Sequence, residues 1–140
     1  MIIEIEKEDE IQEAAKKIIT TYGQRFYAFS GEMGIGKTTL IRHMLDSLGV
    51  EEFEGSPTFA IVQSYGSATP IYHLDCFRIE NQTEAFEIGI EELFSESAYF
   101  FVEWPEKIIS FLPNDVIWVY IRKADHTEKR IIHIAHDNQS

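Results

Sequence analysis

Eight consecutive residues have the types and spacing of a phosphate-binding loop. The segment matches the pattern G-x-x-x-x-G-K-[ST] at every fixed position, and it consists of Gly31, Glu32, Met33, Gly34, Ile35, Gly36, Lys37 and Thr38. Glycine has no Cβ, so the backbone of such a loop can wrap closely around an anion and point its N–H groups inward. The lysine of the pattern reaches the β- and γ-phosphates of a nucleotide, and the hydroxyl of its last residue can ligate Mg²⁺. The segment therefore predicts a site for a nucleoside triphosphate and magnesium.

The residues on either side of the loop favour this interpretation over that of a plain glycine turn. Residues 25–30 are mostly apolar, as in a buried parallel strand. After the loop, apolar residues recur at helical spacing as far as Gly49, which is expected to end the helix; they are Leu40, Ile41, Met44, Leu45 and Leu48. The start of this helix adds about half a positive charge, directed at the same anion. A strand, a loop and a helix in this order form the context that the pattern requires.

Two acidic residues stand at the ends of predicted strands, where they could complete a magnesium site. Asp75 lies near the end of the run 70–77, and Glu103 directly follows four apolar strand residues. Mg²⁺ takes oxygen ligands, and ligands of open α/β sheets bind beside the carboxyl ends of the strands. Thr38 and Glu103 are therefore the predicted metal ligands. A residue that simply leaves a strand into solvent is the alternative for Glu103.

Three further residues have both a functional and a simpler interpretation. Thr58 follows Pro57 after the first helix of the nucleotide unit, where switch loops sense the γ-phosphate, but it could be a plain turn threonine. Trp104 could stack beside the nucleotide or belong to the core. His73 shares a strand face with Asp75, and a structural histidine is the simpler interpretation.

The composition indicates an ordinary globular chain with a single domain, residues 1–140. The 140 residues are 44% hydrophobic and 26% charged, which suffices to bury a core. A net charge of −12 disfavours direct, non-specific binding of nucleic acid. The charge is consistent both with solubility alone and with a basic partner protein, and composition does not separate the two. The sequence shows no run of 18 apolar residues and no signal peptide, so we expect a cytoplasmic chain outside the membrane. The single Cys76 excludes an intramolecular disulfide.

Hydrophobic periodicity and turn residues predict strands that alternate with helices early in the chain and pair as hairpins later. Besides the helix after the loop, the predicted helices span residues 8–22, 83–94 and 106–111. The predicted strands span residues 1–6, 25–30, 59–65, 70–77, 98–102, 116–121 and 130–135, with the third and fourth and the last two as hairpins. This order predicts a three-layer α/β protein with a mixed central sheet, and with the loop a P-loop NTPase-like fold.

Four motifs occur in an order and at distances that resemble those of the TsaE (YjeE) family. They are the glycine-rich loop at residues 31–39, S-P-T-F at 56–59, Y-H-L-D-C-F-R at 72–78 and V-E-W-P-E-K at 102–107. The loop is generic, whereas the combinations H-x-D-x-[YF]-R and E-W-P are rather specific. The resemblance covers about residues 5–135. The chain departs from the family at Phe77, where tyrosine is usual and one hydroxyl is therefore missing.

This resemblance implies the small bacterial ATPase of the machinery that makes threonylcarbamoyladenosine on tRNA, with ATP and Mg²⁺ as cofactors. Lys37 would hold the phosphates, and Thr38 and Glu103 would coordinate Mg²⁺. Asp75 would act in hydrolysis, either by orienting the attacking water or as an acid that does not bind the metal directly but lies next to its ligands.

The resemblance also implies further contacts and partners. The loop as far as Thr39, Thr58 in a switch loop, and Trp104 would lie at the nucleotide, and the adenine would lie between residues 7–10 and 124–128. Family members work with two partner subunits, so a TsaD-like transferase and a TsaB-like companion are implied. ATP turnover would reset or regulate the transferase rather than perform the tRNA chemistry.

Three other functions use the same kind of loop. A small-molecule or nucleotide kinase usually has a lid with several arginines, but this chain has arginine only at positions 25, 42, 78, 122 and 130. A GTPase is suggested by R-K-A-D at residues 122–125, which lacks the asparagine of N-K-x-D. A nucleotide-dependent binding module is the third, because no arginine finger is evident, an element worth about 10³–10⁵ in rate. We therefore expect slow hydrolysis by the chain alone and stimulation by partners.

Overall fold

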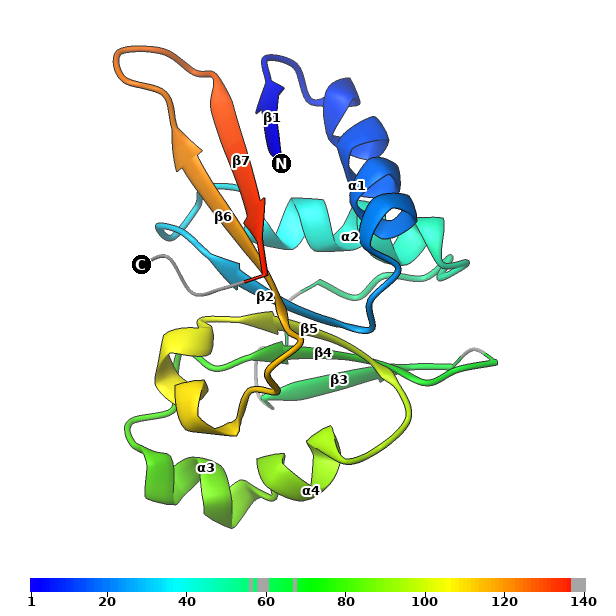
Figure 1. The fold of residues 1–140 in the computed structure, drawn as a ribbon, viewed down its shortest axis with the longest axis vertical. Helices are drawn as coiled ribbons and strands as arrows, with labels where there is room; N and C mark the ends of the chain where they lie inside the picture. The colour runs from blue at the N-terminus through cyan, green and yellow to red at the C-terminus, as the bar shows by residue number, and fades with distance from the viewer. Residues whose placement is uncertain (56, 58–60, 67, 137–140) are drawn as a thin grey trace.

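The computed structural model describes residues 1–55, 57, 61–66 and 68–136. A mixed sheet of seven strands runs through it in the order β1-β7-β6-β2-β5-β4-β3 (Figure 1). The strands are β1 (Ile2–Ile5), β2 (Phe26–Ser30), β3 (Val62–Tyr65), β4 (Ile71–Asp75), β5 (Tyr99–Glu103), β6 (Ile117–Lys123) and β7 (Arg130–Ala135). The prediction of an α/β protein with a mixed sheet is confirmed.

Four neighbouring strands in the centre of the sheet, β6, β2, β5 and β4, run parallel. The strands β2 and β5 are apolar along most of their length, which suits a position covered on both faces. Parallel strands end at the same edge, so the residues that follow Ser30, Asp75 and Glu103 meet there. The strands β3 and β7 pair antiparallel with β4 and β6, as the two predicted hairpins require. The first strand, β1, is added at the edge beside β7.

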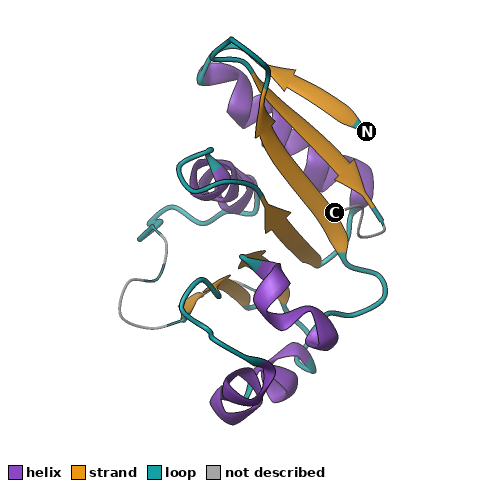
Figure 2. Cartoon of the chain, turned by 90° about the vertical axis from the view of Figure 1, so that its left-hand side faces the viewer, coloured by secondary structure: helices purple, strands orange, loops and turns teal. Residues whose placement is uncertain are grey.

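Helices lie in two groups, one against each face of the sheet (Figure 1 and Figure 2). The helices α1 (Asp9–Tyr22) and α2 (Lys37–Ser47) share an apolar cluster with Tyr27 and Phe29 of β2. The helices α3 (Gln82–Ile88) and α4 (Ile90–Phe94) and the 3-10 helix η1 (Pro105–Phe111) share the other cluster with Phe26 and Ala28. Alternate residues of one strand thus face the two groups, as the pleat of a strand requires.

One of the two helices predicted for the second helical group differs from the structure. One helix over residues 83–94 is wrong, because Gly89 has a left-handed backbone (φ 92°) and separates α3 from α4. Glycine takes this conformation without a steric penalty and commonly ends a helix in it. The short helix predicted at residues 106–111 is present as the 3-10 helix η1, which is interrupted at Ile108. Among the described helices, none has the length and apolar character needed to cross a bilayer.

Strand ends were predicted to within a few residues. The strand predicted from residue 59 is described only from Val62 on, since residues 59 and 60 lie outside the described part of the chain. The strand β5 begins at Tyr99 and includes Glu103, so this carboxylate projects from the last position of a central strand. The position of Glu103 at a strand end places it at the edge where ligands of parallel sheets bind.

Candidate functional site

The glycine-rich loop lies between β2 and α2, at the carboxyl edge of the parallel strands. Gly34 and Gly36 have φ values of 78° and 113°, in the region that glycine enters without a Cβ penalty. At Gly31 the reason for glycine is a close approach, because a Cβ there would lie 2.6 Å from the carbonyl oxygen of Ile121 in β6. The loop therefore passes tightly over the neighbouring strand and leads into the N-terminus of α2, the end of a helix that attracts anions.

The side chains of the loop lie in different surroundings. Glu32 and Met33 are exposed at its tip, whereas Ile35 is buried in the apolar cluster beneath α1 and α2. Thr38 and Thr39 are half-buried in the first turn of α2. Ile35 therefore anchors the loop to the apolar cluster, while the tip of the loop stays exposed.

Lys37 is almost fully buried, with 4% of its surface exposed. Its Nζ donates a hydrogen bond of 2.6 Å to the carbonyl oxygen of Gly31 and lies 3.6 Å from the centre of the Trp104 ring. Burial lowers the pKa of Lys37, and nearby carboxylates, chiefly that of Glu103, oppose this effect. The lysine is therefore held at the base of the loop by one carbonyl and one aromatic face.

Glu103 connects the start of α2 to strand β4 through its two carboxylate oxygens. The Thr38 hydroxyl lies 3.0 Å from Oε1, and Nε2 of His73 lies 2.7 Å from Oε2. Glu103 is 4% exposed, so it does not simply leave the strand into solvent. The two residues predicted as metal ligands therefore face each other at the end of the loop.

Asp75 lies beside Glu103, because the two residues are register partners at the ends of β4 and β5. Its Oδ1 accepts a hydrogen bond of 3.0 Å from the backbone N–H of Phe77. Burial raises the pKa of Asp75, and the charge of Glu103 acts in the same direction. The edge thus carries two neighbouring acids in different environments, one fully buried and one half-buried.

Trp104 lies between the loop and the residues after β4. Its backbone is left-handed (φ 58°, ψ 51°), and its ring lies 5.0 Å from the ring of Phe77. Phe77 is 45% exposed, so a tyrosine at this position would have its hydroxyl partly open to solvent. Trp104 also packs against the apolar cluster of η1, so it is partly a core residue. Thr58, the predicted switch residue, lies outside the described residues.

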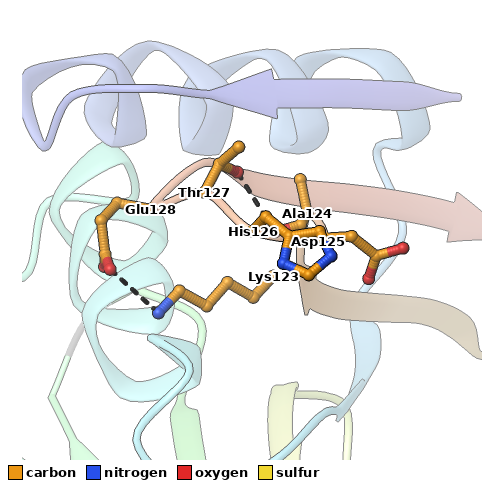
Figure 3. Close-up of a pocket in the computed structure, with 6 residues that line it drawn as sticks. All are labelled: Lys123, Ala124, Asp125, His126, Thr127 and Glu128. Carbon is orange, nitrogen blue, oxygen red and sulfur yellow. Dashed lines mark hydrogen bonds and ion pairs between the residues drawn. The ribbon is translucent and has the colours of Figure 1, made fainter.

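The loop of the last hairpin surrounds a hollow of about 540 Å³ lined by residues 123–128 (Figure 3). Within it, Lys123 and Glu128 form an ion pair of 3.1 Å, and the Thr127 hydroxyl donates to the carbonyl oxygen of Ala124. Immediately after it, Nε of Arg130 donates a hydrogen bond of 3.1 Å to the carbonyl oxygen of Ile35. The hairpin that the resemblance assigns to the adenine is thus fastened to the glycine-rich loop.

The oxygen atoms of Thr38 and Glu103 fit magnesium rather than a softer metal. Mg²⁺ is held in proteins by one or two oxygen ligands and completed by waters and substrate phosphates. Within the described part of the chain, no three His, Cys, Asp or Glu side chains gather as a metal cluster. A hydroxyl and one carboxylate beside a glycine-rich loop of this pattern are the donor set expected of a magnesium–nucleotide site.

Three residues join the site without having been predicted there. His73 was expected to be structural but contacts Glu103, while Glu106 accepts a hydrogen bond of 2.6 Å from the Ser30 hydroxyl. Arg130 reaches the loop from the far end of the chain. The alternation of His73 with Asp75 was a usable signal for the first, but contacts across about a hundred residues leave no local pattern.

The chain has relatives of known name. A family model described as threonylcarbamoyl adenosine biosynthesis protein TsaE matches residues 5–132. The tRNA threonylcarbamoyladenosine biosynthesis protein TsaE of Bacillus subtilis is 33% identical over 110 residues, which cover 78% of this chain and 68% of that protein. The protein of the same name from Rickettsia bellii is 31% identical over 138 residues, covering 95% and 93%. A crystal structure of Bacillus subtilis YdiB has the same fold, with a TM-score of 0.77 and 24% identity over 99% of this chain and 87% of that one.

Proposed function

The chain belongs to the TsaE family, and from this premise we propose that it binds and hydrolyses ATP with Mg²⁺ for the machinery that makes N6-threonylcarbamoyladenosine on tRNA. The observation that carries the proposal is the distance of 3.0 Å between the Thr38 hydroxyl and Glu103 Oε1. These atoms lie where a P-loop NTPase holds magnesium, at the end of the glycine-rich loop and the tip of a neighbouring parallel strand. We assign this chain, as one domain, to the P-loop NTPase-like fold on that basis.

Each residue of the site has a role that follows from its place. The N–H groups of the loop, residues 31–36, would bind phosphate oxygens, and Lys37 would add a positive charge after turning from the carbonyl of Gly31. Thr38 and Glu103 would hold Mg²⁺, which supplies neutralisation of the phosphate charge. Asp75, whose pKa is raised by burial, would orient the attacking water or support the metal's waters. Trp104 would border the nucleotide.

The remaining predictions rest on the family. Thr58 would respond to the γ-phosphate as part of a switch loop, and residues 7–10 and 124–128 would enclose the adenine. The contact of Arg130 with the loop supports this place for the base, since it joins the hairpin to the phosphate site. Turnover by the chain alone would be slow and would rise with a TsaD-like transferase and a TsaB-like subunit. Such work on tRNA would take place in the cytoplasm.

The test is nucleotide binding and hydrolysis by the wild type and by Lys37→Ala. Loss of a charged hydrogen-bond donor is expected to weaken ADP and ATP binding by about 10- to 100-fold and to abolish hydrolysis. The matched control is Lys17→Ala, because Lys17 is an exposed lysine of α1. Unchanged turnover in Lys37→Ala would overturn the assignment. Brisk turnover of the wild type without partners would contradict the proposed stimulation, and phosphate transfer to a nucleoside or sugar would show a kinase instead.

A further inference from the structure

His73 is a fully buried histidine in the middle of β4 that contacts the carboxylate of Glu103. Its Nε2 lies 2.7 Å from Glu103 Oε2. An ionised carboxylate only accepts hydrogen bonds, so the imidazole must be the donor. Hydrogen bonds to a charged group are shorter and stronger than neutral ones, and this length fits that class.

The other nitrogen of His73, Nδ1, gives no reason for a histidine at this position. Nδ1 is buried and finds no hydrogen-bond partner in the described part of the chain. The ring instead stacks on Phe53, with 5.8 Å between the ring centres and 21° between the planes. Leaving a polar atom buried and unpaired destabilises the folded state, so an apolar side chain would suit this pocket better. What the chain gains from an imidazole here must come through Nε2.

The two oxygens of Glu103 have different neighbours. Oε2 is taken by His73, while Oε1 faces the Thr38 hydroxyl at the start of α2. A carboxylate can rotate about its last bond, and a hydrogen bond to one oxygen fixes the plane of the group and leaves the other oxygen facing outward. In metal sites, partners behind the ligands fix ligand orientation in this way, and their loss typically costs about 10- to 100-fold in metal affinity.

We propose that His73 is a positioning residue: its Nε2–H group holds Oε2 of Glu103 and thereby presents Oε1 to the magnesium of the bound nucleotide. This inference rests on the proposed function, because it requires Glu103 to be a metal ligand. His73 does not act on the attacking water itself, since its ring is fully buried while Asp75 is the half-buried acid at this edge.

The experiment measures how strongly Mg²⁺ improves the binding of ADP, by calorimetry with and without the metal, and counts Mn²⁺ bound with ADP by electron paramagnetic resonance. His73→Phe fills the same space and keeps an aromatic ring against Phe53. It is expected to lose about 10- to 100-fold of the metal affinity with little change in metal-free ADP affinity. His73→Gln, whose amide can reach the position of Nε2, is expected to restore metal affinity to within a few-fold of wild type.

His133→Phe is the matched control and should leave metal affinity unchanged. His133 is a half-buried strand histidine whose ring lies tilted against that of Tyr120 in β6, with 6.0 Å between the ring centres. Wild-type metal affinity in His73→Phe would overturn the inference. If His73→Phe does not fold, the test is the comparison of His73→Asn with His73→Gln. The shorter amide of asparagine cannot reach Glu103, so equal metal affinity in these two variants would overturn the inference as well. If Mg²⁺ did not change the ADP affinity of the wild type, the proposed function would be overturned, and with it the role of His73.

Discussion

The ammonium of Lys37 lies 3.6 Å from the centre of the Trp104 ring, and Trp104 itself has a left-handed backbone. A left-handed conformation costs a non-glycine residue roughly 1–2 kcal/mol. A cation–π contact returns about 0.5–2 kcal/mol, with the larger values at desolvated sites such as this one. The ring is also supported by Phe77. The contact between Lys37 and Trp104 therefore offsets the cost of the left-handed backbone at Trp104.

Trp104 should report nucleotide binding by its fluorescence. The chain has two tryptophans, and the other, Trp118, is 5% exposed in β6, paired with Ala28 of β2 and Ala135 of β7. Movement of the Lys37 ammonium toward a phosphate would change the surroundings of Trp104 only. We expect Trp118→Phe to retain the emission change on adding Mg–ADP and Trp104→Phe to abolish it. A signal that follows Trp118 instead would show that Lys37 and Trp104 keep their contact when nucleotide binds.

Glu103 should separate metal binding from nucleotide binding. Glu103→Gln keeps the shape of the side chain but removes the charge. It should lower Mg²⁺-dependent hydrolysis by more than the about 10- to 100-fold that supporting residues contribute, with metal-free ADP binding within a few-fold of wild type. The measurements are ATP turnover and calorimetry at several Mg²⁺ concentrations.

Glu103→Ala should in addition destabilise the fold, because it removes the acceptor of the hydrogen bonds from Thr38 and His73. The expected loss is about 1–3 kcal/mol in the free energy of unfolding. A Glu103→Gln variant that retained full Mg²⁺ dependence would make Glu103 a structural residue only.

Asp75 should make the folded protein less stable at neutral pH than its asparagine variant. Burial raises the pKa of Asp75 above the ordinary value of 3.8, so the folded state binds a proton more readily than the unfolded chain. The free energy of unfolding therefore falls as pH rises through the window from 3.8 up to the raised pKa. Asp75→Asn keeps the acceptor for the Phe77 N–H and should raise the unfolding midpoint in urea at neutral pH. Below 3.8 this advantage should vanish.

The same variant should lose activity, since a neutral amide accepts a weaker hydrogen bond from the attacking water than an ionised carboxylate does. If Asp75 also takes up the proton of that water, turnover should fall by about 100-fold or more. Asp115→Asn, at an exposed acid, is the control for both measurements. A variant that is destabilised at neutral pH would contradict the direction of the pKa shift.

The parts of the protein that could be predicted from the sequence are those that depend on residues close together in the chain. Glycines 31, 34 and 36, the apolar strand before them and the helical spacing after them identify one strand, one loop and one helix, because each depends on neighbours along the chain. The acids Asp75 and Glu103 were found because a strand end is also a local feature. The prediction of one helix over residues 83–94 was wrong at Gly89, where a single left-handed residue ends the helix although the apolar periodicity continues on both sides.

What could not be predicted depends on residues far apart in the sequence. His73 lies 30 residues from Glu103, and Arg130 lies 95 residues from Ile35. Their contacts follow from the strand order, with β5 between β2 and β4 and with β7 beyond β6. The strand order depends on how the two apolar clusters pack, and no short sequence motif predicts it. The resemblance to a family supplied the proposed roles of the site residues, but it did not supply these contacts.

Gly31 and Gly34 should differ in what an added methyl group costs. A Cβ at Gly34 meets nothing within 4 Å, so Gly34→Ala should cost only the roughly 1–2 kcal/mol of a left-handed alanine. At Gly31 the methyl would lie 2.6 Å from the backbone oxygen of Ile121, and a strand in the centre of a sheet cannot yield. Overpacking of this kind adds about 1–3 kcal/mol. Moving the loop would also displace the carbonyl that accepts from Lys37, so Gly31→Ala should weaken ADP binding as well.

The control is Gly23→Ala, at a left-handed glycine that ends α1 with nothing within 4 Å of its Cβ. It should lose stability about as much as Gly34→Ala while ADP binding stays at the wild-type level. Urea unfolding and ADP titration of the three variants give both quantities. Equal stability in all three would mean that the loop can move away from β6, and that the close approach at Gly31 does not hold the loop in its shape.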